Sequence, residues 1–263
     1  MTLPPIVSRA AALAVAGLML LVQPAAAAEL QVVSSGGFAS AYKALAPEYE
    51  RASGDTLKIQ WGPSMGDTPN AVPARLARGE KLDVVIMVGY ALDDLIKQGK
   101  VLPDSKVVLA RSSIGVAVKA GAPKPDISSA EAVKQALLAA KSIAYSDSAS
   151  GVYISTRMFQ RLGIADQMAG KARKIPATPV GEIVAKGEAE LGFQQIAELK
   201  AVEGIDLVGP LPPELQQVTL YSAGIVAGSH DPAAAKKLLE FLASPAAAPA
   251  IAATGLEPTA TAP

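Results

Sequence analysis

The chain has 263 residues, with 24 lysines and arginines against 24 aspartates and glutamates, and it contains no cysteine. This balance leaves no excess of positive charge to neutralise a nucleic-acid backbone, and no polybasic segment points to a membrane surface. With a single histidine and no cysteine, the chain has neither disulfides nor a zinc site of the histidine–cysteine kind. Half of the residues are apolar but only 4% are aromatic, so we expect an aliphatic core in one large domain or two smaller ones.

The first 28 residues have the layout of a secretory signal peptide. Arg9 is their single charge, an apolar run follows over residues 10–22, and small residues close the segment at 25–28. The run is short for a transmembrane helix, which disfavours the alternative of an uncleaved anchor. We therefore expect cleavage between Ala28 and Glu29 and a periplasmic mature protein. No cysteine follows the run, so we expect no lipid attachment of the bacterial lipoprotein kind.

Short aliphatic runs alternate with amphipathic segments in the first part of the mature chain. Turn-forming residues separate them, as at Ser53-Gly54-Asp55. The alternation predicts strands and helices in turn, with strands at 30–34, 57–61 and 83–88 and helices at 40–51, 70–78 and 91–98. Such an order is typical of a parallel sheet that is covered by helices on both sides.

The rest of the chain continues this alternation and ends in helices. Ser128 and Glu131 have the spacing of a capping box that opens a helix, and Asp231 before Pro232 is typical of another helix start. The pattern predicts strands at 114–119, 142–145, 190–194 and 217–227, an extended segment at 205–213, and helices at 128–140, 152–162, 181–186, 231–243 and 244–255.

Polar segments follow several predicted strands, at the position where ligands bind in open α/β sheets. The first amides of the helices that follow are unpaired, and the helix dipole favours an anion there. Hydroxyl and amide groups without a matching cluster of cations suit an oxyanion or a carboxylate better than a metal ion, and we expect no cofactor. These segments are Ser34-Ser35-Gly36-Gly37, residues 62–66, residues 146–151 and Gln194-Gln195.

Several motifs occur in a characteristic order: an aliphatic strand ending in serine at 30–37, Gly-Pro-Ser at 62–64, Ser-Gly-Val-Tyr at 150–153, a Val-Ala-Lys-Gly-Glu-Ala segment within 184–192, and a Leu-rich helix at 239–245. Together they resemble the periplasmic molybdate-binding proteins of ABC transporters, within the type II solute-binding proteins. The resemblance implies an α/β fold of two lobes, with two mixed sheets flanked by helices and joined by a two-strand hinge. We expect lobe one to comprise residues 29–113 and 220–263, and lobe two to comprise residues 114–219.

The resemblance and the strand-end positions together select the candidate ligand-binding residues. They are Ser34, Ser35, Ser64 and Met65 from lobe one and Ser148, Ser150, Tyr153, Val180, Gln194 and Gln195 from lobe two, with Arg111 near the crossover. Each has an alternative structural role. The serines could cap helices, Met65 and Tyr153 could fill the core, Arg111 could form a surface or hinge salt bridge, and strand alternation allows only one of the glutamines to face the cleft.

The sequence departs from the molybdate-binding family in residues that would meet the ligand. Gln194 or Gln195 stands where that family has a tyrosine, and Arg111 could face the cleft. An amide and a guanidinium suit a carboxylate at least as well as a tetrahedral oxyanion. The resemblance nevertheless implies the binding component of an ABC importer for an oxyanion such as molybdate or tungstate, and sulfate also remains open. The alternative is a binder of a small organic carboxylate, for uptake or as the partner of a periplasmic sensor.

These features predict a monomeric binding protein whose partners are a small anion and an inner-membrane permease. Closure of the two lobes would complete the set of donors around the ligand. We do not expect an enzyme, because one histidine and no cysteine leave few nucleophile–base pairs. A hydrolase that uses one of the serines is a less favoured alternative, since the sequence shows no base beside them.

Overall fold

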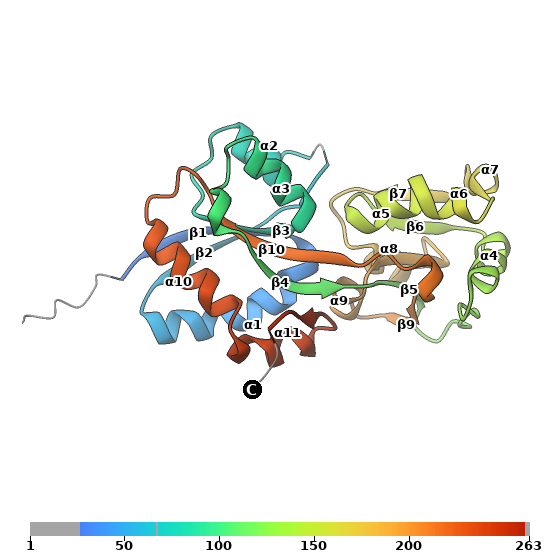
Figure 1. Ribbon diagram of the computed structural model, residues 1–263. Helices are drawn as coiled ribbons and strands as arrows, with labels where there is room; N and C mark the ends of the chain where they lie inside the picture. Colours follow the sequence, from blue (N-terminus) through green and yellow to red (C-terminus); the bar gives the residue numbers. More distant parts are fainter. Residues whose placement is uncertain (1–26, 67, 261–263) are drawn as a thin grey trace, which may run out of the picture.

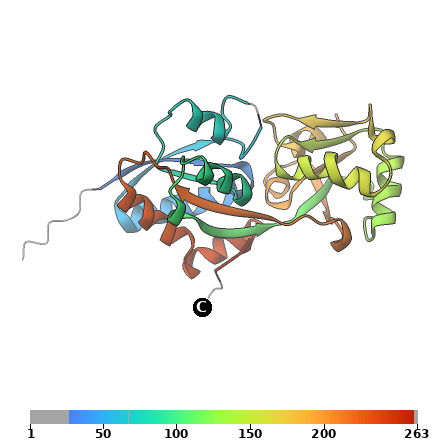
Figure 2. The same cartoon turned by 45° about the horizontal axis from the view of Figure 1, so that its top comes forward.

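The computed structural model describes residues 27–66 and 68–260, so the predicted signal peptide lies outside the described residues except for residues 27 and 28. The chain forms two α/β lobes that lie side by side, and extended segments run from one lobe to the other (Figure 1 and Figure 2). Among the described residues, no helix is long and apolar enough to cross a membrane.

Lobe one is built on a mixed six-stranded sheet. Its strands are β1 (Glu29–Ser34), β2 (Thr56–Trp61), β3 (Val84–Val88), β4 (Val107–Ser112), β10 (Thr219–Ile225) and β11 (Glu257–Pro258). They are arranged in the order β11-β4-β10-β3-β1-β2, with β1 parallel to β2 and β3, and β10 antiparallel to β3 and β4. The C-terminal ends of these three parallel strands therefore lie on the same side of the sheet, the side that faces lobe two.

Helices cover both faces of this sheet. They are α1 (Gly36–Ser53), α2 (Val72–Ala77), α3 (Gly89–Lys97), α10 (Pro232–Leu242) and α11 (Ala248–Ala253). In α1, Phe38, Tyr42, Leu45 and Tyr49 recur at helical spacing and are all buried, and each such side chain contributes about 1.5–3 kcal/mol when removed from water. The helix ends at Gly54, whose φ of 81° suits glycine.

Lobe two carries a second mixed sheet, of five strands. They are β5 (Ile114–Lys119), β6 (Ile143–Ser146), β7 (Ala172–Ile175), β8 (Leu191–Gln195) and β9 (Ile205–Pro210), in the order β7-β6-β8-β5-β9. Its helices are α4 (Ala130–Ala139), α5 (Ala149–Tyr153), α6 (Phe159–Arg161), α7 (Ala165–Met168), α8 (Val180–Ala185) and α9 (Ile196–Lys200), with a π-helical turn at Ile154–Met158 joining α5 to α6. The two sheets and their flanking helices confirm the predicted fold class.

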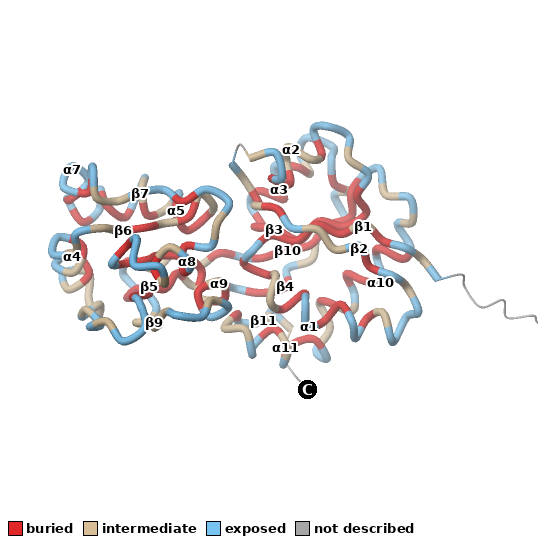
Figure 3. The backbone as a smooth tube through the Cα atoms, turned by 180° about the vertical axis from the view of Figure 1, so that it is seen from behind, coloured by how far each residue is buried: buried red, intermediate tan, exposed pale blue. Residues whose placement is uncertain are grey.

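The chain passes between the sheets at two neighbouring places. β4 ends at Ser112 and β5 begins at Ile114, and the return runs from β9 to β10. Gln216 ties the two crossings together, because its Oε1 accepts the backbone N–H of Ile114 at 2.8 Å and its Nε2 donates to the Ile114 carbonyl at 3.0 Å. Each lobe has buried residues along its own strands (Figure 3), so each has a core of its own, and Ala149 and Ala197 of lobe two pack against the core of lobe one.

The local predictions near helix starts were partly wrong. The predicted cap of α4 is displaced by one residue, since the Ser129 hydroxyl, not that of Ser128, accepts the N–H of Ala132 at 3.2 Å. The Glu131 carboxylate accepts a hydrogen bond from the Gln135 side chain within the helix, so it does not complete a capping box. The cap of α10 is confirmed, because Asp231 accepts the N–H of Ala234. Strands β4, β7 and β11 and helices α7 and α9 were not predicted, and α9 contributes to the site described below.

Candidate functional site

A cavity of about 270 Å³ lies between the lobes, beside the C-terminal ends of β1, β2 and β3. Both lobes line it. Lobe one contributes Ser35, Gly36, Gly37, Ala39, Lys43, Trp61, Gly62, Pro63, Asn70 and Tyr221, and lobe two contributes Ser146, Asp147, Ser148, Ala177, Thr178, Pro179, Gln194 and Glu198. We call this cavity the cleft.

The first turn of α1 supplies the anion-binding side of the cleft. Ser35 ends the connection from β1 and is only 3% exposed, and its hydroxyl has no hydrogen-bond partner among the described residues. The backbone N–H of Ser35 is occupied, since it donates to Ile86 at 2.8 Å. The amides of Gly36 and Gly37 follow at the start of an 18-residue helix, where intrahelical acceptors are lacking and the dipole favours negative charge.

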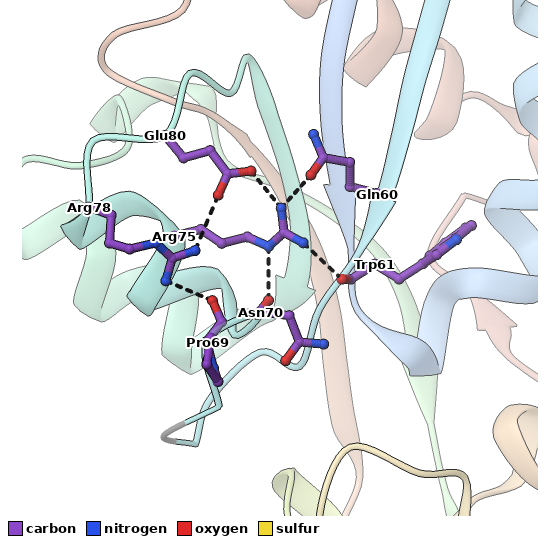
Figure 4. A network of polar contacts seen from close by, with 7 residues as sticks. All are labelled: Gln60, Trp61, Pro69, Asn70, Arg75, Arg78 and Glu80. Carbon is purple, nitrogen blue, oxygen red and sulfur yellow. Dashed lines mark hydrogen bonds and ion pairs between the residues drawn. The ribbon is translucent and has the colours of Figure 1, made fainter.

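An arginine network holds the wall formed by Trp61 and Asn70 (Figure 4). Arg75 donates to the carbonyl of Asn70 at 3.0 Å and to Glu80 at 2.6 Å, and it also contacts Gln60 and the Trp61 carbonyl. Its guanidinium is therefore committed to the wall and does not serve as a ligand-binding cation. Lys43, whose Nζ lies 5.2 Å from the centre of the Trp61 ring, is instead the cation that lines the cleft.

Lobe two closes the opposite side with the loop before α5. Ser148 stands at the N-cap position of α5, and the Asp147 carboxylate accepts the N–H of Ala177 at 3.2 Å. The Asp147 carboxylate is therefore engaged by this loop and does not cap α5. Ala177 has a φ of 55°, which is uncommon for a residue other than glycine and fixes the loop that carries Thr178 into the cleft wall.

The two glutamines at the end of β8 point in different directions. Gln194 lines the cleft, and its Oε1 accepts the N–H of Val180 at 2.8 Å, which leaves its amide group to donate toward the cleft. Gln195 is turned away, and its Nε2 donates to Thr219 at 3.0 Å. This division follows the alternation of side chains along a strand.

Glu198 brings a carboxyl group into the cleft from α9. The side chain is partly buried and reaches lobe one, where a Cβ added to Gly36 would stand 2.5 Å from its Oε1. Burial, with a smaller effect from the charge of Asp147, raises the pKa of Glu198 to about 7, although the Gln194 side chain and the Gln195 backbone act to lower it. The carboxyl group can therefore hold or release a proton near neutral pH.

Tyr221 lies beside this carboxyl group on β10. It is 3% exposed, and its hydroxyl packs against Gly37 so tightly that a Cβ there would be 1.8 Å from the oxygen. Burial, with the charges of Glu198 and Tyr90, raises the pKa of Tyr221 well above its ordinary value. The phenol keeps its proton at physiological pH and is a hydrogen-bond donor in the cleft. A donor-lined site with a titratable carboxyl group can support acid–base chemistry as well as binding.

Three of the predicted site residues line the cleft: Ser35, Ser148 and Gln194. Several others lie directly behind its wall, where they hold the loops. Ser34 donates to the carbonyl of Ser35 at 3.2 Å, and Ser64 accepts the N–H of Val88 at 2.9 Å. The hydroxyl groups of Ser150 and Ser146 are hydrogen-bonded at 2.9 Å. The side chain of Val180 is buried, and its backbone N–H is the group that donates to Gln194.

The remaining predicted residues lie farther from the cleft. Met65 accepts from the Tyr90 hydroxyl at 3.6 Å, and Tyr153 donates to the Leu215 carbonyl at 2.8 Å and lines a second cavity. Arg111, on β4, is exposed and lies 3.6 Å from Glu257 of β11, which is the salt-bridge role named as its alternative.

Sequence reasoning missed Glu198, Tyr221 and Lys43. Glu198 lies in the first turn of a five-residue helix, and its position three residues after Gln195 was the available signal. Lys43 lies on the exposed side of α1, where a lysine needs no special explanation. Tyr221 stands within an apolar strand, so it was indistinguishable from a core residue.

Two lobes on separate mixed sheets, a double crossing and a donor-lined cleft between them define a type II periplasmic binding fold. Residues 30–257 match the sequence model of the bacterial extracellular solute-binding proteins, and the chain belongs to this family. The family is one of extracellular proteins, and the periplasmic location and the cleavage site remain predictions.

Solved structures share this fold at low sequence identity. The periplasmic molybdate-binding protein of Azotobacter vinelandii is 23% identical, with a TM-score of 0.69 over 86% of this chain and 98% of that one. Peb3 from Campylobacter jejuni is 14% identical, with a TM-score of 0.64 over 87% of this chain and 99% of that one. At these identities, the likeness establishes the fold alone.

A much more similar relative is an enzyme. The aconitate isomerase of a Pseudomonas species is 54% identical over 250 residues, which cover 94% of this chain and 95% of the relative. The expectation that this chain is not an enzyme is therefore wrong. It rested on the lack of nucleophile–base pairs, and an isomerisation by proton transfer needs no nucleophile, only a positioned acid or base.

Proposed function

We propose that this protein binds aconitate in the cleft and interconverts its cis and trans isomers. The observation that carries the proposal is the 54% identity to an aconitate isomerase over nearly the full length of both chains. The match extends over 94% of this chain and 95% of the relative, so it is not confined to one lobe.

The chemistry of the cleft supports a polycarboxylate ligand. Aconitate carries three carboxylates, and the cleft offers donors in separate places: the Ser35 hydroxyl with the Gly36 and Gly37 amides, Lys43 at the wall, and the Gln194 amide on lobe two. Hydrogen bonds to a charged carboxylate are worth about 1.5–3 kcal/mol each, so the buried and unpartnered Ser35 hydroxyl is a strong anchor.

Aconitate can change isomer through a proton shift. Its central carbon bears one carboxylate, and each of the two outer carbons bears another, so moving the double bond from one side to the other gives aconitate again. The geometry of the new double bond depends on how the former single bond is held. The reaction consumes no oxidant, reductant or cofactor, and it requires a protein group that can accept and return a proton.

These considerations favour the organic acid over molybdate as the ligand. A tetrahedral metal oxyanion needs hydrogen-bond donors only, whereas an organic acid with a mobile proton also gives a use to a carboxyl group that can accept and return that proton. Family membership also supports a second function, the delivery of a bound organic acid to an inner-membrane permease or a sensor. A protein that binds aconitate without changing its isomer would favour that role.

The test uses the exported protein with cis-aconitate, trans-aconitate, the saturated tricarboxylate tricarballylate, and molybdate. A ligand at about 1,000 times its dissociation constant adds about 4 kcal/mol of stability, roughly 8–16 °C in melting temperature for this chain length. Proton NMR follows conversion of each isomer. We expect the tricarboxylates to raise the melting temperature and both aconitates to reach the same mixture. A shift with molybdate alone and no conversion would contradict the proposal.

A further inference from the structure

Glu198 and the start of α1 meet across the cleft. Gly36 contributes one of the first amides of the helix, and the Glu198 carboxyl group lies against the same residue from the other lobe. A substrate carboxylate bound to those amides and to Ser35 is thus placed beside Glu198. The carbon next to that carboxylate is the one whose proton must move.

We infer that Glu198 is the catalytic base of this cleft, taking a proton from one outer carbon of bound aconitate and returning it to the other. The inference rests on the proposed function and adds the residue that performs its proton transfer. The carboxylate of Glu198 accepts the proton as the C–H bond breaks, and the electron pair spreads over the three central carbons. The resulting carboxylic acid then gives the same proton to the far carbon as the double bond shifts, so atoms and electrons balance.

One carboxyl group is sufficient for both steps. The two outer carbons are separated by a single carbon, so a group on one face of the substrate reaches both. Gln194 lines the cleft together with Glu198, and its side chain is fixed because its Oε1 accepts the Val180 N–H at 2.8 Å. Its influence lowers the pKa of Glu198 and so favours the ionised form that acts as the base.

The other titratable groups around Glu198 fit different roles. Asp147 uses its carboxylate to accept the Ala177 N–H at 3.2 Å, and the Tyr221 phenol retains its proton. Lys43 stacks over Trp61 at the exposed side of α1, and Lys200, on the same helix as Glu198, faces Gly255. Tyr221 is placed to donate to the carboxylate that gains charge as the proton leaves.

The raised pKa of Glu198, about 7, suits this assignment. A general base is most effective when its pKa lies near the working pH, because it is then available in the ionised form and still basic. For a carboxyl group, the active ionised form increases with pH. We therefore expect kcat/KM to rise as the pH increases through about 7.

The test compares Glu198→Gln with the wild type and with Glu182→Gln. Glu182 is a matched control, since it is a half-exposed glutamate on α8 that pairs with Lys186 and does not line the cleft. We expect Glu198→Gln to lower the isomerisation rate about 10²–10⁴-fold, the usual contribution of a general base, and still to show a melting shift with trans-aconitate. Glu182→Gln should keep both properties.

Two further measurements separate a base from a merely structural residue. Glu198→Asp should retain some activity, and the residual activity of Glu198→Gln should lose the rise through pH 7. A wild-type rate and pH profile in Glu198→Gln, with the wild type active, would overturn this inference and leave the proposed function standing. A wild type that neither binds nor converts aconitate would overturn both.

Discussion

Oε1 of Glu198, in lobe two, occupies the space that a side chain on Gly36, in lobe one, would fill, at 2.5 Å from the ideal Cβ position. The lobes therefore touch at the start of α1, the place where an anion is best stabilised. A glycine at this point allows the carboxyl group to come close to the helix amides. The same closeness makes position 36 a sensitive probe of where Glu198 must be.

Replacing Gly36 with alanine should reduce isomerisation with little effect on folding. The added methyl group meets the flexible end of Glu198, which can swing aside, and alanine is a better helix former than glycine. A displacement of about 1 Å in a catalytic group can cost roughly 100-fold in rate. We expect that loss in a steady-state assay, with a change in unfolding free energy below about 1 kcal/mol.

Gly37 and Gly228 provide the comparison for this variant. A Cβ on Gly37 would lie 1.8 Å from the Tyr221 hydroxyl oxygen and 2.1 Å from its ring, and this ring is buried, so Gly37→Ala should destabilise the fold by about 1–3 kcal/mol. Gly228 has open space around it, so Gly228→Ala should change neither rate nor stability. Equal behaviour of all three variants would show that position 36 has no special relation to the site.

Ser35→Ala and Ser64→Ala should have opposite effects. The Ser35 hydroxyl is unpartnered, so its removal should leave the melting temperature unchanged and weaken aconitate binding about 10–100-fold, the value of a hydrogen bond to a charged group. Ser64 accepts the buried N–H of Val88, so its removal should cost about 1–3 kcal/mol of stability. Calorimetric titration and thermal melts distinguish these results, and weaker binding confined to Ser64→Ala would restore Ser64 as the ligand residue.

Asp83 should make the fold sensitive to acid. Burial of its carboxylate acts to raise the pKa, but hydrogen bonds from the backbone N–H of Gln31, from Ser229 and from His230 outweigh burial and lower it. A lowered folded-state pKa gives stability above the unfolded value of about 3.9, and this stability is lost as the pH falls through the folded value. Urea unfolding should therefore show Asp83→Asn to be less stable than the wild type at pH 7, with the difference shrinking below pH 4. The exposed Asp94→Asn serves as the control.

The fold was largely predictable because its signals are local. The buried run at 84–88 and the turn after α1 mark a strand and a helix end whatever surrounds them. The predicted capping box was wrong because both Ser128 and Ser129 can cap, and Glu214 of a distant turn also accepts an N–H at this helix start, that of Ala130. Contacts of this kind depend on the folded chain and have no pattern in the nearby sequence.

The site was predictable where its chemistry comes from the backbone. Ser35 with Gly36 and Gly37 after a strand indicates an anion site in any α/β sheet. Glu198 was missed because its importance comes from Gly36, which is far away in the sequence and reaches it only when the lobes meet. A glutamate in a short helix otherwise resembles a solvated surface residue.

Lys43 and Trp61 provide a direct measure of binding. Trp61 is the single tryptophan, lies at the cleft wall and has the Lys43 ammonium 5.2 Å from its ring centre. A bound carboxylate should draw the ammonium from the ring and change the fluorescence of Trp61. Lys43→Ala should weaken aconitate binding about 2–5-fold, as expected for a partly solvated ion pair, and reduce its dependence on salt. Lys97→Ala, which removes an exposed lysine outside the cleft, should change neither. An unchanged salt dependence in Lys43→Ala would show that the ligand charge is met by the helix amides and hydroxyls instead.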